Sequence, residues 1–170
     1  MIFGLLYAFE LDLYTFEGCI IIVRCTQMNI QGIWLKIETD KFPILPGEEY
    51  EIVNEGMYGK ALCAYLEKEL PNFGLTINFY CAEDWGWWVD ITEQGLNMGL
   101  LIYGHTVVGV SPEQYAIGSS IQDSPKWFWR KFKKVDVTTQ VTAVMDKLEN
   151  ALEYDEDIFT VERFDEFPEF

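Results

Sequence analysis

The stretch CAEDWGWWVD, from Cys81 to Asp90, is the part of the sequence that decides the fold. Apolar and polar residues alternate on both sides of Glu83–Gly86, which is typical of two strands joined by a tight turn. We expect a type I turn with Gly86 in the left-handed conformation, which costs glycine little. The alternation runs through Leu75, Ile77, Phe79 and Cys81 before the turn and Trp87, Val89 and Ile91 after it. The stretch therefore predicts a hairpin, and a hairpin implies an antiparallel sheet.

Other short segments with the same alternation predict further strands, because glycine, proline or serine separates them. In residues 33–38, Ile33, Leu35 and Ile37 alternate with Trp34, Lys36 and Glu38. This pattern predicts a strand with the first three residues on a buried face and the other three on a solvent-exposed face. The further candidates are residues 7–13, 18–25, 97–105, 114–120, 126–132 and 158–161.

Two segments change to the three- and four-residue spacing of an amphipathic helix. The first covers about residues 56–70, and Pro71 ends it. The second covers about 139–153, after Thr138 as the N-cap. Short antiparallel strands with only two helices predict an α+β fold, with about six to eight strands and both helices packed on one face. We expect residues 1–170 to form one domain, since no linker is long enough to divide them.

The charge limits the classes of partner. The chain has 28 acidic and 12 basic residues, a formal net charge of −16. This balance excludes non-specific binding of nucleic acid or of an anionic membrane, and it would attract a basic protein. The alternative is that the acidity only keeps an aromatic-rich protein soluble.

The cysteines and the single histidine indicate neither a metal site nor a cofactor. Cys19, Cys25, Cys63 and Cys81 lie in apolar contexts without a C-x-x-C motif, and His105 is the one histidine. We expect free, buried thiols in a cytoplasmic protein, because acidic residues interrupt the apolar N-terminal stretch and argue against a signal peptide. No run reaches the ~18 apolar residues that span a bilayer.

The hairpin is also the leading candidate for a binding site. Glu83 and Asp84 at its tip, with Trp85 and Trp88, would offer acidic and aromatic contacts to a partner. Trp87 instead shares the core face with Val89. The alternative is that the stretch is only a structural turn. Catalysis by the two carboxylates is disfavoured, because adjacent residues of a strand point to opposite faces.

A second candidate site lies in the basic segment from Lys126 to Lys134. Trp127, Trp129 and Arg130 could line an aromatic cleft near Trp88 that takes a small molecule or carbohydrate. The same pattern suits an edge strand protected by lysines, or a segment that pairs with the acidic residues near the end of the chain.

Four stretches resemble a family of small bacterial proteins of uncharacterised function. They are FPILPGEEYEIVNEGMYGKAL, YCAEDWGWWVDI, WFWRKFKKVDVTTQV and FDEFP, between Phe42 and Pro168. The family shares an E-D-W-G-W-W hairpin, a W-x-W-R-x-F strand and a threonine-containing helix start. The resemblance implies a bacterial or phage origin and a compact single domain, and it implies no activity, cofactor or ligand.

The sequence favours a non-enzymatic, acidic protein-binding module, in the manner of an immunity protein or inhibitor that engages a basic partner. The small-molecule or carbohydrate module is the second hypothesis. The third is an enzyme that uses His105 with Glu83 or Asp84, although no known catalytic motif occurs. A homodimer stays open, because a second copy could cover the surplus aromatic residues.

Overall fold

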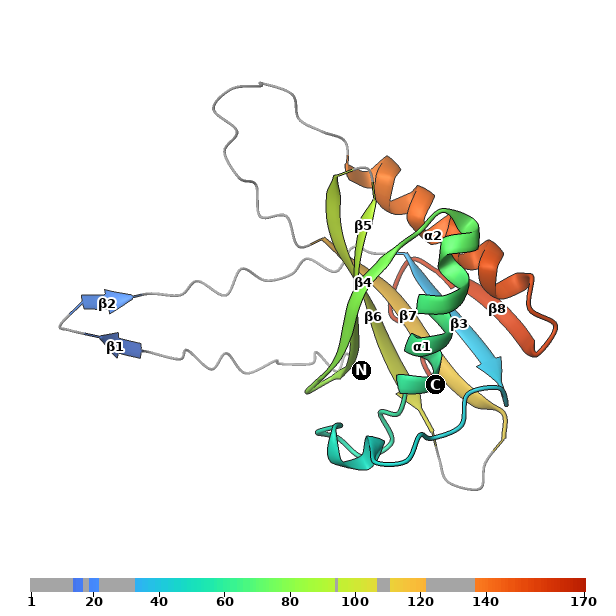
Figure 1. Cartoon of the computed structure of the whole chain (residues 1–170), viewed down its shortest axis with the longest axis horizontal. Coiled ribbons are helices and arrows are strands. Elements are labelled where there is room, and N and C mark those ends of the chain that lie inside the picture. The colour runs from blue at the N-terminus through green and yellow to red at the C-terminus, as the bar shows by residue number, and fades with distance from the viewer. Residues whose placement is uncertain (1–13, 17–18, 22–32, 94, 107–110, 122–136) are drawn as a thin grey trace, which may run out of the picture.

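The computed structural model describes residues 14–16, 19–21, 33–93, 95–106, 111–121 and 137–170. Six strands form one antiparallel sheet (Figure 1), which from edge to edge contains β4 (Ile77–Glu83), β5 (Gly86–Glu93), β6 (Leu96–His105), β7 (Glu113–Ile121), β3 (Trp34–Thr39) and β8 (Ile158–Phe164). Two short strands, β1 (Tyr14–Phe16) and β2 (Cys19–Ile21), pair with each other. The α-helices are α1 (Lys60–Glu69) and α2 (Val137–Glu153), and the short 3₁₀ helices are η1 (Glu48–Tyr50) and η2 (Leu70–Phe73).

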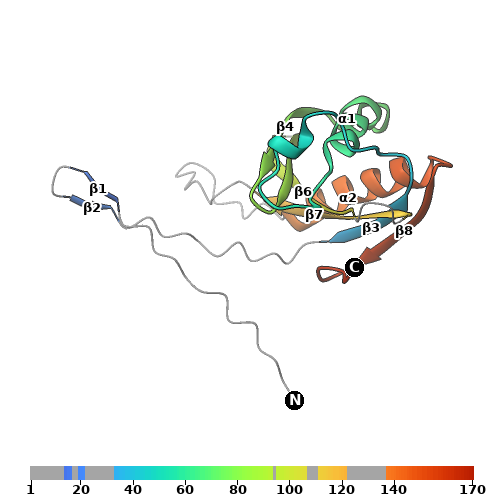
Figure 2. The ribbon, with the colours of Figure 1, turned by 90° about the horizontal axis from the view of Figure 1, so that it is seen from below.

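Both α-helices cover the same face of the sheet, as Figure 2 shows. Between them and the strands lies the core, since this face gathers the apolar residues at every second strand position. Its fully buried members include Leu35, Ile37, Leu62, Leu66, Val89, Leu100, Ile117, Val144 and Leu148. The predicted α+β class, with a mainly antiparallel sheet and two helices packed on it, is confirmed.

The helix boundaries differ from the prediction at three ends. α1 begins at Lys60 because Gly56, with a φ of 88°, belongs to the preceding loop. Pro71 does not end the helical conformation at once, because it lies in the first turn of η2. The N–H that proline lacks has no partner in a first turn, so its absence costs nothing. Thr138 is not the N-cap of α2, because this helix already includes Val137.

The register of β4 shifts between Ile77 and Phe79, and the shift overturns part of the predicted alternation. Ile77 is buried, but beyond it Tyr80 and Ala82 pack against the core, whereas Phe79 is exposed. The prediction that Phe79 and Cys81 share one strand face with Ile77 is therefore wrong. An irregularity of one residue moves every later side chain to the other face.

The sheet face away from the helices carries a small cluster of its own. The rings of Trp34 and Trp88 lie over Gly118 and Gly99, where an added Cβ would fall 2.5 Å and 2.0 Å from ring atoms. With Ala116 in the same cluster, Trp34 is only 2% exposed. The prediction that Trp34 lies on a solvent-exposed face of its strand is therefore wrong. Small residues on the neighbouring strands leave room for its ring, which is buried there.

Several expectations concern residues outside those described. They are the strand at 7–13, most of the strand at 18–25, and the basic segment 126–132. Of the cysteines, Cys63 is buried and free, as predicted, but the free Cys81 is only half-buried. In the described part of the chain, neither helix has the length and apolar character needed to cross a membrane.

Candidate functional site

The tip of the β4–β5 hairpin presents two exposed carboxylates, those of Glu83 and Asp84. Glu83 pairs with Gly86 in the register, so Asp84 and Trp85 form the turn itself. Gly86 has a φ of 148°, and a Cβ there would lie 2.3 Å from the carbonyl oxygen of Ile102. Glycine is required on both counts. The position of the predicted turn is confirmed, and Gly86 is already the first residue of β5.

The three tryptophans of the hairpin divide as the sequence predicts. Trp87 is buried in the core on the helix side, while Trp85 and Trp88 are half-buried on the other face. The ring of Trp85 packs on that of Tyr103, with 5.2 Å between centroids and 35° between planes. Trp85 and Trp88 are therefore largely engaged with the sheet, and Glu83 and Asp84 are the parts of the predicted site that project into solvent.

A loop that the sequence analysis did not include in the site lies beside the hairpin tip. The side-chain amide of Asn54 donates a hydrogen bond to the carbonyl oxygen of Asp84, and Figures 1 and 2 both place the loop around η1 next to the β4–β5 turn. Tyr50 is 87% exposed and Val53 71% exposed. The contact surface, as we name it, consists of the exposed side chains of Glu49, Tyr50, Glu51, Val53, Glu55, Glu83 and Asp84.

Glu48 holds this loop against the rest of the domain. Its side chain is buried, and Oε1 accepts hydrogen bonds from the N–H groups of Gly59 at 2.7 Å and Lys60 at 2.8 Å. Oε2 accepts one from the N–H of Leu45 at 3.1 Å. Two of these donors lie at the N-terminus of α1, where backbone N–H groups lack partners and favour a negative charge. The carboxylate thus caps the helix and fixes the loop at once.

The contact surface is strongly acidic. It contains five carboxylates, and the nearby Lys60 forms an ion pair with that of Glu51. Among the described residues, Glu49, Glu55, Glu83 and Asp84 form no ion pair. Like charges held close together give a negative potential that attracts a cationic partner.

Sequence reasoning missed Tyr50 and Val53 because it placed no strand, helix or candidate site between the strand at 33–38 and the helix that begins near residue 56. A usable indication was present: GEEYEIVNEG puts one aromatic and two aliphatic residues among four acids in a segment bounded by glycines. Large apolar residues in a loop that cannot join the core are candidates for an interface.

The remaining predicted site residues are those of the ligand cleft and of the hypothetical enzyme. Trp127, Trp129 and Arg130 lie outside the described residues, so the expected cleft with Trp88 is not described. His105 is exposed, and its ring stacks on that of Phe170, with 5.1 Å between centroids. No hydrogen bond joins His105 to Glu83 or Asp84, which all belong to the described part of the chain.

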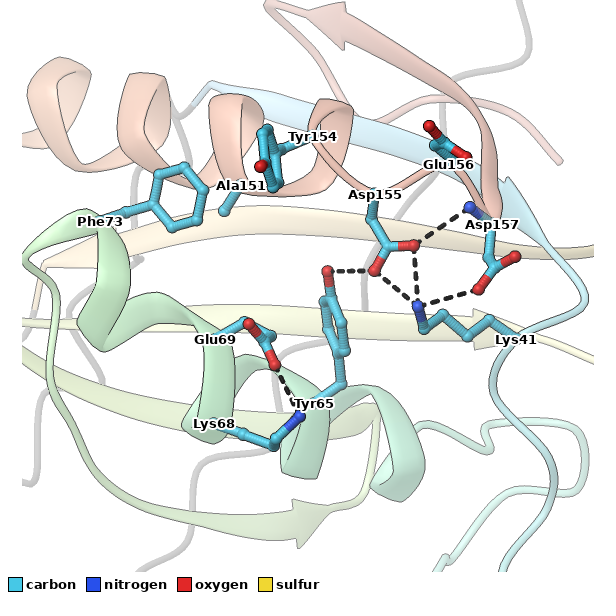
Figure 3. Close-up of a pocket in the computed structure, with 10 residues that line it drawn as sticks. All are labelled: Lys41, Tyr65, Lys68, Glu69, Phe73, Ala151, Tyr154, Asp155, Glu156 and Asp157. Carbon is cyan, nitrogen blue, oxygen red and sulfur yellow. Dashed lines mark hydrogen bonds and ion pairs between the residues drawn. The ribbon is translucent and has the colours of Figure 1, made fainter.

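A separate cavity of about 410 Å³ opens between α1, η2 and the C-terminal end of α2 (Figure 3). Phe73 and Tyr154 form one side of it, with their ring centroids 6.4 Å apart in an edge-on arrangement. Lys41, Tyr65 and Asp155 form the other side.

Asp155 is the centre of a hydrogen-bond network in this cavity. Its carboxylate accepts bonds from Lys41 Nζ at 2.6 and 2.8 Å, from Tyr65 Oη at 2.7 Å and from the N–H of Asp157 at 3.1 Å. Burial alone would raise the pKa of Asp155, but the bonds from Lys41, Tyr65 and Asp157 outweigh it and lower this pKa. The bond to Asp155 raises the pKa of Lys41.

The network keeps each group in its ordinary state at neutral pH. Burial, and then the bond to Asp155, raise the pKa of the Tyr65 hydroxyl, so it stays protonated while Asp155 stays ionised. A general acid or base works best with a pKa near the operating pH, and these shifts move all three groups away from it. We therefore interpret the network as a structural contact that holds together the segment after β3, helix α1 and the α2–β8 turn.

The residues that the structure describes include no group of three or more His, Cys, Asp or Glu side chains placed to hold a metal ion. In comparisons of the chain with known proteins, no family model, curated protein or solved structure gave a significant match.

Proposed function

We propose that the chain is a non-enzymatic protein-binding module whose contact surface engages a basic protein partner. One observation carries the proposal: Tyr50 and Val53 are 87% and 71% exposed and stand among five carboxylates, of which only that of Glu51 forms an ion pair within the described structure. Exposed apolar side chains surrounded by polar ones are typical of an interface. Tyrosine is one of the residues that most often dominate binding energy.

The partner is expected to be basic because four carboxylates of the contact surface form no ion pair with the described residues. Lysine and arginine side chains of a partner would supply these neighbours. Such complementarity mainly raises the association rate and the specificity, and its effect weakens as the ionic strength rises.

The rigid attachment of the surface also supports this function. The bonds of Glu48 to α1 and of Asn54 to the hairpin hold the loop and the tip together before a partner arrives. A preordered surface loses less conformational entropy on binding. An inhibitor or immunity protein, which must hold its target tightly, would benefit from this arrangement. The free thiols of Cys63 and Cys81 fit a reducing, cytoplasmic compartment.

The proposal is tested by recovering the partner from the native host with the intact chain, followed by purification and titration. We expect Tyr50→Ala and the charge reversal Asp84→Lys each to weaken binding about tenfold or more, a difference of about 1.4 kcal/mol. Glu156→Lys is the matched control. Glu156 is exposed and lies in the α2–β8 turn, and its replacement by lysine changes the charge by the same amount as Asp84→Lys.

Two results would contradict the proposal. If Glu156→Lys weakens binding as much as Asp84→Lys, only the overall charge matters and the contact surface has no special role. If Tyr50→Ala leaves the affinity unchanged, the exposed ring is not part of the interface.

The small-molecule or carbohydrate module remains the second proposal, and the cavity of about 410 Å³ supports it. Phe73 and Tyr154 could contact a flat apolar group there. Among the described residues that line this cavity, Trp88 of the predicted ligand cleft is absent. The hydrogen-bonding groups of Asp155 and Tyr65 already bind one another. We rank it second because binding a polar ligand would require these bonds to break.

A further inference from the structure

The cavity between α1, η2 and the end of α2 has more acidic than basic groups in its lining. Its charged side chains are four carboxylates and two ammonium groups, those of Glu69, Asp155, Glu156, Asp157, Lys41 and Lys68. Four negative and two positive groups give a formal charge of −2 at neutral pH. The volume of about 410 Å³ lies in the range of cavities that bind small molecules. The lining therefore favours a small cation over a small anion.

Both lysines of the lining already bind carboxylates. Lys41 Nζ lies 2.6 Å from Oδ2 of Asp155 and 3.2 Å from Oδ2 of Asp157. Lys68 Nζ lies 2.8 Å from Oε1 of Glu69. An anionic ligand would have to compete with these carboxylates for the ammonium groups, and the remaining carboxylates would repel it.

The carboxylates, in contrast, can accept a further cation. Glu156 is exposed, and within the described part of the chain its side chain forms no hydrogen bond or ion pair. The side chain of Asp157 is 75% exposed, and its one ion pair with the described residues is the 3.2 Å contact with Lys41. An ionised carboxylate has about four acceptor positions. A cation can therefore bind beside Glu156 and Asp157 while the hydrogen bonds of Asp155 stay in place.

The aromatic side chains of the cavity favour the same class of ligand. Tyr154 is 83% exposed although Phe73 packs on it edge-on, so most of its ring is free to contact a ligand. A cation already lies over another ring of the cavity, since Lys41 Nζ is 5.2 Å from the ring centroid of Tyr65. The face of an aromatic ring is partially negative and attracts an ammonium group within about 6 Å.

We propose that this cavity binds a small organic ammonium ion, whose apolar body contacts Phe73 and Tyr154 and whose charge lies beside Glu156 and Asp157. The inference rests on the second proposed function, the small-molecule module, and deepens it by naming the class of ligand. A sugar would need the hydrogen-bonding groups of Asp155 and Tyr65, which already bind one another. An ammonium ion held by the rings and by Glu156 leaves that bond intact.

The test uses the full-length chain and three probes that share one body and differ in charge. They are 2-phenylethylammonium, which is positive, 2-phenylethanol, which is neutral, and phenylacetate, which is negative. Binding is followed by the chemical shifts of the backbone amides in NMR spectra, because these report both the affinity and the place of binding.

Two variants of the chain each remove one feature of the cavity, and each has a matched control. Tyr154→Ala removes the exposed ring, and Phe79→Ala removes an exposed ring of β4. Glu156→Gln removes the carboxylate without an ion pair, and Glu162→Gln makes the same change at an exposed residue of β8. Neither Phe79 nor Glu162 lines the cavity. A thermal unfolding curve for each variant checks the fold.

We expect the ammonium probe to give saturable shifts in residues 65–73 and 151–157. Its affinity should exceed that of the neutral probe about tenfold or more, and the anion should not bind. Tyr154→Ala and Glu156→Gln should each weaken binding of the ammonium probe about threefold or more, whereas the two controls should leave it unchanged. Glu156→Gln should not change the affinity for the neutral probe, which a general disturbance of the cavity would do.

Equal affinities for the ammonium and neutral probes at these residues would overturn the assignment of a cation and would leave the small-molecule module standing. The absence of saturable shifts there with all three probes would overturn both. Shifts from the ammonium probe that are confined to residues 48–56 and 82–86 would place the amine at the contact surface and would also overturn the proposal. No protein partner is used, so a failure here is distinct from a failure of the contact surface.

Discussion

Replacing Glu48 with alanine is expected to destabilise the domain and to release the loop that carries Tyr50. The substitution removes a buried carboxylate that accepts three hydrogen bonds, from the N–H groups of Leu45, Gly59 and Lys60. All three donors then lose their partner at once, and α1 loses its only side-chain cap among the described residues.

The size of the effect follows from these bonds. A hydrogen bond to a charged group contributes about 1.5–3 kcal/mol, and loss of a helix N-cap costs about 0.5–2 kcal/mol. The three bonds share one carboxylate and are not additive. We therefore expect Glu48→Ala to lower the free energy of unfolding by about 3 kcal/mol. Glu48→Gln keeps one acceptor oxygen for α1 but turns an NH₂ group toward Leu45, so its loss should be smaller, about 1–2 kcal/mol.

Urea denaturation measures the change directly. With a slope of about 2 kcal/mol per molar urea, the midpoint of Glu48→Ala should fall by about 1.5 M. Glu49→Ala is the control, because Glu49 is the next residue, also acidic, but exposed, and it should stay within about 0.5 kcal/mol of the unmodified chain. Equal midpoints for the two variants would refute the role assigned to the Glu48 carboxylate.

Three further predictions concern the core, the cavity and the hairpin. The pKa of Asp155 is lowered in the folded chain. The ionised carboxylate therefore stabilises the fold above its ordinary pKa near 3.8, and this contribution is lost as the pH falls through the pKa of the folded state. The free energy of unfolding of Asp155→Asn should depend less on pH below about 4 than that of the unmodified chain. Burial, and then the nearby Glu48, raise the pKa of the Cys63 thiol, so in a chain whose other cysteines are serine it should react with a thiol reagent at pH 8 only on unfolding, and fast reaction in the folded chain would contradict this. Gly86→Ala should cost at least about 2 kcal/mol in thermal unfolding, because its Cβ meets the Ile102 carbonyl, whereas Gly95→Ala, which meets nothing, should cost about 1 kcal/mol.

The hairpin and the helices could be predicted because local patterns determine them. The alternation around Trp87 and Val89 and the glycine at 86 specify strand, turn and strand within a few residues. The same local reasoning failed at Phe79, because a shift in strand pairing has no counterpart in the alternation itself.

The burial of Trp34 and the position of the contact surface depend on residues distant in sequence. Trp34 is buried because Gly118 lies beneath its ring. Tyr50 becomes part of a surface with Asp84 because Asn54 reaches across to the hairpin. Such pairings arise from strand order and loop packing, which a single sequence does not specify. The acidic character of the site, by contrast, was predictable from the composition, because an excess of acidic residues does not depend on which residues lie together in the fold.

The central claim is that a basic partner binds at the contact surface. Hydrogen–deuterium exchange on the complex with the purified partner tests it most directly, because protection of backbone amides reports which segments the partner covers. We predict slower exchange in residues 48–56 and 82–86, with little change in residues 150–157 around the α2–β8 turn. Protection confined to residues 150–157, with the loop and the hairpin tip exchanging as in the free chain, would contradict the claim.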